Sequence, residues 1–133
     1  MYKGYLLKAG GVAIPNRYIR PQSYSVTPCR RLELSAERDM AGVLHRDTAA
    51  HTPSRVEFET PPLANGELGA LNGLLAAAFT DGGARRLTLE YYVPEIDGYR
   101  AGAFYLEDTE YRIRHIGGAR VAYEPVRYAF NEY

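Results

Sequence analysis

The chain has 133 residues, a length typical of one domain, and its sixteen basic residues are balanced by sixteen acidic ones. This zero formal charge disfavours a dedicated duplex-DNA binder, which normally carries a basic surplus. No segment approaches the roughly 20 apolar residues of a membrane span, and the single cysteine, Cys29, excludes an internal disulfide.

The first half of the chain consists of short alternating segments. The stretch 2–20 predicts a β-hairpin, and 23–28 predicts a further strand. The segments 30–35 and 55–60 also alternate, and we expect them to pair as the two stems of a hairpin. Between them, 35–55 holds two of the three histidines and is predicted to form a long projecting arm or loop.

A single helix is predicted over 65–79, with Asn65 as its N-cap. Gly69 and Gly73 lie four apart on one face, which indicates close packing of that face on a sheet. The apolar residues recur at helical spacing and form one stripe, comprising Leu68, Leu71, Leu75 and Phe79.

The second half again reads as strands, over 85–93, 99–107, 111–116 and 120–133, with Pro125 placing the last at an edge or dividing it. Consecutive strands joined by tight turns predict antiparallel pairing. The expected fold is therefore a single domain, mostly β with one α-helix, built as an antiparallel β-sandwich or a partly open barrel.

No motif for catalysis or metal binding emerges. A site can be drawn with His45, Asp47 and His51, but their spacing matches no zinc motif, so a metal-dependent hydrolase is the less favoured alternative. His115 lies in an alternating segment, which predicts a packed histidine. No nucleophile elbow or phosphate-binding glycine loop is present. We expect no enzyme activity, no metal and no cofactor.

A single-stranded nucleic-acid-binding barrel is a further alternative. The segments 18–21, 111–116 and 126–130 interleave aromatic residues with arginines, as such proteins do. Alternation places many of these tyrosines and arginines on opposite faces, which favours core tyrosines beneath a charged outer face.

Three stretches, "MYKGYLLKAGGVAIPNRYIRPQSYSVTP", "RDMAGVLHR" and "HTPSRVEFETPPL", resemble a family of small uncharacterised proteins encoded in tail-gene clusters of bacteriophages and prophages. The ending, with "YYVPEIDGYRAGAFYLEDTEYRIRHI" and "YEPVRYAFNEY", is similar to the same family. The resemblance supplies no catalytic motif. It implies a tail-tube-like fold, a place in the tail of the virion and synthesis in the host bacterial cytoplasm.

The resemblance implies a structural subunit of a phage tail, forming a homo-oligomeric ring, expected to be a hexamer, in the tail tube or at its distal, baseplate end. A tail terminator or head–tail completion protein is the alternative. Partners would be copies of the chain and neighbouring tail or baseplate proteins, with no membrane and no sequence-specific nucleic acid. The arm residues expected at this interface are Arg38, Asp39, Leu44, His45, Arg46, Asp47, His51 and Arg55.

Overall fold

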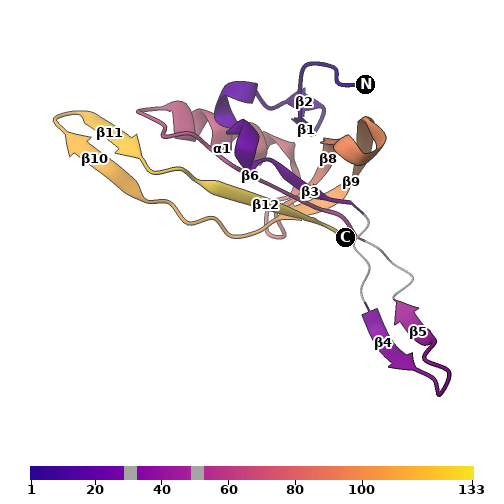
Figure 1. The fold of residues 1–133 in the computed structure, drawn as a ribbon. Helices are drawn as coiled ribbons and strands as arrows, with labels where there is room; N and C mark the ends of the chain where they lie inside the picture. The colour runs from indigo at the N-terminus through magenta and orange to yellow at the C-terminus, as the bar shows by residue number, and fades with distance from the viewer. Residues whose placement is uncertain (29–32, 49–52) are drawn as a thin grey trace.

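The computed structural model describes residues 1–28, 33–48 and 53–133. Its body is one antiparallel sheet in the order β2-β1-β8-β9-β12-β6-β3, with β7 also paired to β8 (Figure 1). The strands are β1 (Leu7–Ala9), β2 (Val12–Ala13), β3 (Ser25–Thr27), β6 (Arg55–Glu59), β7 (Phe79–Asp81), β8 (Arg86–Val93), β9 (Gly98–Leu106) and β12 (Arg127–Glu132).

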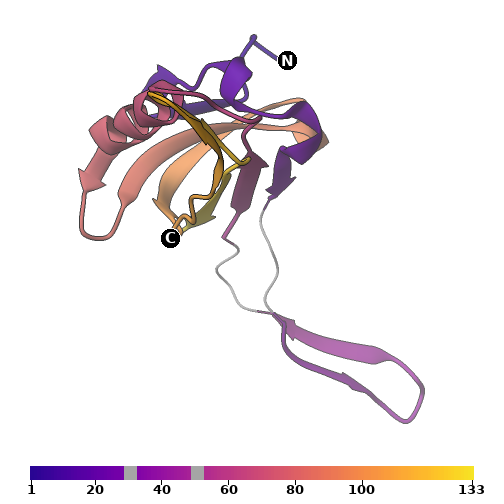
Figure 2. The same cartoon turned by 90° about the vertical axis from the view of Figure 1, so that its left-hand side faces the viewer.

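The core lies on the concave side of this curved sheet (Figure 2). Alternate residues of β6 and β8 are buried there, as period-2 patterning predicts, whereas in β12 four consecutive residues, 128–131, are buried. The helix α1 (Glu67–Ala78) contributes three of its four leucines, Leu68, Leu71 and Leu75, to the same core. Three short 3₁₀ turns complete the body, at Asn16–Tyr18, Pro21–Ser23 and Pro94–Ile96. The predicted mostly-β fold with one helix is thus confirmed.

Two hairpins stand outside this sheet. One joins β4 (Glu33–Arg38) to β5 (Leu44–Thr48), and the other joins β10 (Ile113–Gly117) to β11 (Arg120–Tyr123). Each forms a separate two-stranded sheet, and Figure 1 shows them projecting from opposite ends of the molecule.

The expected pairing of 30–35 with 55–60 is wrong for residues 33–35, while 30–32 lie outside the described residues. β4 pairs with β5, whereas β6 pairs with β3 and β12 in the body. The two strands of the projecting hairpin therefore pair with each other and not with a strand of the body. Alternation identifies a half-buried strand but not its partner, and the partner of β4 is only six residues further along the chain, at Leu44.

Two details of the predicted helix also change. Asn65 is not the N-cap: Gly66 occupies that position in a left-handed conformation. The helix ends at Ala78, so Phe79 begins β7. Close packing at the two helix glycines is contradicted as well, because a Cβ placed at Gly69 or Gly73 would meet no atom within 4 Å.

The C-terminal segment divides at the predicted proline. β11 ends at Tyr123 and β12 begins at Arg127, with Pro125 between them. His115 is exposed on β10, so the expected packed histidine is wrong. No helix in the described part of the chain is long and apolar enough to cross a membrane.

Candidate assembly surfaces

The turn between β4 and β5 is built by Asp39. Its Oδ1 accepts hydrogen bonds from the backbone N–H groups of Ala41 at 2.9 Å and Val43 at 3.0 Å. The guanidinium of Arg38 donates to the carbonyl of Gly42 at 3.0 Å, and Gly42 adopts a φ of +83° that favours glycine. Arg38 and Asp39, both expected at an interface, therefore shape the turn itself.

The turn exposes apolar side chains at its end. Met40 is fully exposed, and Val43 and Leu44 are also largely accessible. We call these three residues the arm tip. Burying such a surface against another protein would be favourable, because apolar area would leave water. Of the three, only Leu44 was predicted from the sequence to lie at an interface. The sequence signal for Met40 and Val43 is the spacing of Asp39 and Gly42, which indicates a turn at these residues.

The remaining arm residues are described only in part. His45, Arg46 and Asp47 lie in β5, whose backbone pairs with 35–37 of β4. His51 lies outside the described residues. Among the residues that are described, no group of three or more His, Cys, Asp or Glu side chains is arranged to hold a metal ion.

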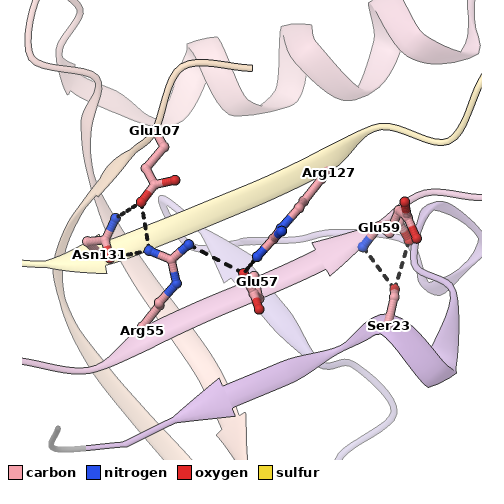
Figure 3. Close-up of polar contacts among 7 residues, drawn as sticks. All are labelled: Ser23, Arg55, Glu57, Glu59, Glu107, Arg127 and Asn131. Carbon is pink, nitrogen blue, oxygen red and sulfur yellow. Dashed lines mark hydrogen bonds and ion pairs between the residues drawn. The ribbon is translucent and has the colours of Figure 1, made fainter. Parts of the chain in front are cut away.

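Arg55 belongs to the sheet rather than to the arm, which corrects its predicted place. As the first residue of β6, it donates to Glu107 at 2.6 Å, to Asn131 at 2.9 Å and to Glu57 at 3.4 Å (Figure 3). Arg127 donates to the same carboxylate of Glu57 from β12. This ion-pair network links β6 to β12 and to the residue that follows β9, on the outer face of the sheet.

The network stabilises the ionised form of its carboxyl groups. Hydrogen bonding from Arg127 is the main cause that lowers the pKa of Glu57 below its ordinary value of 4.5. Hydrogen bonds from Arg55 and then Asn131 lower the pKa of Glu107 in the same way. A general acid at neutral pH needs a raised carboxyl pKa, so these groups are suited to ion pairing rather than to proton transfer.

An open hollow of about 570 Å³ lies beside this network, over the outer face of β6 and β12. Five carboxylates and three arginines line it, so its surface has an acidic surplus. The lining residues are Arg55, Glu59, Glu107, Asp108, Glu110, Arg112, Glu124, Pro125, Arg127 and Ala129. Such a surface suits polar contacts with another protein better than binding of an apolar ligand.

The tyrosines of the arginine-rich segments are largely structural. Tyr18 and Tyr128 are buried, and the hydroxyl of Tyr128 donates to Asn72 at 2.8 Å. Their rings are therefore not available to stack on bases, as a single-strand binder would require. Tyr111 is exposed but donates to the same Asn72 oxygen at 3.2 Å.

Comparisons with known proteins agree with this architecture. A family model described as "Family of unknown function (DUF6711)" matches residues 1–133. A search of curated proteins found no match. Among solved structures, a chain from the tail of an empty GTA particle, refined helically with C6 symmetry, has a similar fold. The TM-score is 0.60 at 13% identity, and the match covers 98% of this chain and 91% of the other.

Proposed function

This chain belongs to the family of unknown function DUF6711, and from that starting point we propose that it is a structural subunit of a phage-type tail. The observation that carries the proposal is a fold shared over nearly the full length of both chains with a protein of a tail particle. The surfaces of the chain support an assembly role, because its projecting arm ends in exposed apolar residues.

We further propose that six copies form a ring in the tail tube or at its distal end. The C6 symmetry of the similar tail supports this number. A ring closes through head-to-tail contacts, which need two different patches on each subunit. The charged outer face of the sheet and the projecting arm are two such patches, and their chemistry differs.

The role is one of assembly rather than catalysis. The carboxylates gathered over β6 and β12 are held by arginines, with lowered pKa values at Glu57 and Glu107. These pairs give the outer face alternating charges that can match a neighbouring subunit, since complementary potentials mainly determine specificity and register.

Electron microscopy of the full chain tests this function. The purified protein, alone and co-expressed with the products of its neighbouring genes, is expected to form rings or tubes with six-fold symmetry. Antibody labelling of particles is expected to mark the tail, and the labelled position separates the tube from the distal end. A protein that stays monomeric in both settings and is absent from particles by mass spectrometry would contradict the proposal.

A further inference from the structure

The second hairpin has one apolar face because of a β-bulge. Its register pairs Ile113 with Tyr123 and Ile116 with Val121, with an irregularity between Ile113 and His115. Residues three apart on a regular strand point to opposite faces. The bulge adds one extra residue between Ile113 and Ile116, so their side chains point to the same face. Both isoleucines therefore share one face with Val121 and Tyr123, and we call these four residues the hairpin face.

The two isoleucines of the hairpin face are exposed, whereas Val121 and Tyr123 are half-buried and Tyr123 packs against the core. Ile113 is 57% and Ile116 is 66% accessible, and every residue of β10 is exposed. A two-stranded hairpin with an apolar face is only marginally stable in water unless that face packs on something. The described part of the chain supplies no strand or helix that covers these isoleucines.

The hairpin is nevertheless held firmly at its base and turn. The side chain of Asn65 donates to the carbonyl of Ala119 at 2.7 Å and accepts from the backbone N–H of Val121. Leu63 forms a β-bridge with Tyr123. These ties fix the direction of the hairpin, so its apolar face is presented as a preorganised surface.

A matching surface lies at the other end of the same molecule. The arm tip is apolar, and Figure 1 shows the arm and the β10–β11 hairpin projecting in opposite directions. Two complementary patches at opposite ends of one chain allow each copy to bind the next in the same orientation.

The charges around the two surfaces are also complementary. Glu37 on the arm is exposed, and it makes no ion pair with any described residue. Arg114, at the bulge beside Ile113, is exposed and likewise has no ion-pair partner in the part of the chain that is described. Opposite charges beside an apolar contact favour its formation and determine its register.

We propose that the arm tip of one copy docks on the hairpin face of a neighbouring copy. The inference rests on the proposed function, since it names the contact through which the copies of a tail ring or stack join. The occupant of the hairpin face is thus a defined segment of this same chain, residues 37–44, from a second molecule.

Disulfide trapping in the assembled protein tests this contact. In a full chain carrying Cys29→Ser, Met40→Cys is combined with Ile116→Cys, and assembled particles are oxidised mildly. We expect cross-linked dimers and higher oligomers on non-reducing gels. Mixing a chain with only Met40→Cys and a chain with only Ile116→Cys should give a dimer, which proves an intermolecular bond. Met40→Cys with Ile96→Cys is the matched control, because Ile96 is also an exposed isoleucine but lies outside the hairpin.

Charge exchange gives a second readout that needs no cysteine. Glu37→Arg should raise the concentration required for assembly about tenfold through like-charge repulsion with Arg114. Adding Arg114→Glu to the same chain should restore assembly. Circular dichroism of each variant checks that the fold is retained.

The outcomes separate the two proposals. Assembled particles that show no cross-link beyond the Ile96 control, with no rescue by charge exchange, would overturn the docking contact and leave the proposed function in place. A failure of the unmodified chain to assemble at all would overturn the proposed function and the contact with it.

Discussion

Thr60 links β6 to the start of β12 through two hydrogen bonds. Its backbone N–H donates to the carbonyl of Val126 at 2.9 Å, and its hydroxyl accepts from the N–H of Val126 at 3.0 Å. Both groups are buried. Thr60→Val keeps the shape but leaves the Val126 N–H without an acceptor, so we expect a loss of about 1–3 kcal/mol in the free energy of unfolding. Urea denaturation measures this loss.

Two variants make that measurement specific. Thr60→Ser retains the hydroxyl and should keep most of the stability. Thr88→Val removes an exposed hydroxyl from β8 and should change stability by less than about 0.5 kcal/mol. An equal effect of Thr60→Val and Thr60→Ser would show that packing, rather than the hydrogen bond, accounts for the loss.

Glu57 predicts a pH dependence of stability. Its pKa in the folded chain lies below 4.5, so its ion pairs stabilise the fold fully above that value and are lost as pH falls through the lowered pKa. Because Glu57 is only partly buried, Glu57→Gln should cost about 0.5–1 kcal/mol at pH 7. The difference between wild type and variant should shrink below pH 4.5, as Glu57 itself becomes neutral.

Denaturant titrations at pH 7 and at successive values below pH 4.5 provide the comparison. Glu95→Gln is the control, because Glu95 is exposed in a 3₁₀ turn and makes no ion pair with a described residue. Parallel pH profiles for wild type and Glu57→Gln would show that the carboxylate contributes nothing through its charge.

At the scale of an element, α1 carries two glycines that its own fold does not need. Neither Gly69 nor Gly73 has a neighbouring atom where a Cβ would be, and both are exposed. Replacing both with alanine should raise the free energy of unfolding of the dilute monomer by about 0.5–1 kcal/mol for each site. Thermal and urea unfolding measure the gain.

Gly10 is the informative contrast to the helix glycines. It has a φ of +58°, and a Cβ there would lie 3.0 Å from the Cβ of Ala78 at the end of α1. Gly10→Ala should therefore destabilise the fold, because both the backbone conformation and the space oppose a side chain. If the variant with alanine at both Gly69 and Gly73 is less stable than wild type, the glycine face of α1 makes a contact that alanine disturbs.

The elements differ in how far sequence alone predicts them. Alternation located β6 and β8 because each buries one face, and helical spacing located α1 because its leucines face the core. Strand partners were harder, since alternation is the same whichever neighbour a strand joins. The register irregularity in β10 was also missed, because a bulge depends on pairing rather than composition.

The residues of the candidate assembly surfaces were also predicted only in part from the sequence. Charged arm residues were chosen for their chemistry, yet Arg38 and Asp39 are used within the turn and Arg55 within the sheet. The exposed Met40 is apolar and carries no functional motif, so only its place at the end of a projecting turn distinguishes it. Exposure is a property of the fold, and short sequence patterns do not encode it directly.

At the scale of the whole molecule, stability and assembly are carried by separate parts. The buried hydrophobic cluster lies in the body, in the main sheet, α1 and the segments joining them. The arm forms its own two-stranded sheet outside it. A domain built this way can change its contacts with neighbours at little cost to folding, because few contacts of the arm are shared with the core.

This separation predicts a variant that folds but does not assemble. Replacing Met40, Val43 and Leu44 together with serine removes the apolar arm tip while leaving Asp39 and Gly42 to form the turn. The three side chains are exposed, so the free energy of unfolding should change by less than about 1 kcal/mol. Rings or tubes should be absent at concentrations where the wild-type chain forms them, since the surface that gains from burial is gone.

Val12→Ser is the matched control, because it also removes an exposed apolar side chain but lies in β2 of the body. Unfolding curves and electron micrographs of the three proteins then separate the two effects. If the triple variant assembles like wild type, the arm tip is not a contact surface. If it unfolds, the tip supports the fold, and the separation between core and arm is wrong. Loss of assembly with an unchanged unfolding curve is the expected result, because the exposed tip is the part of the arm that can gain most from burial.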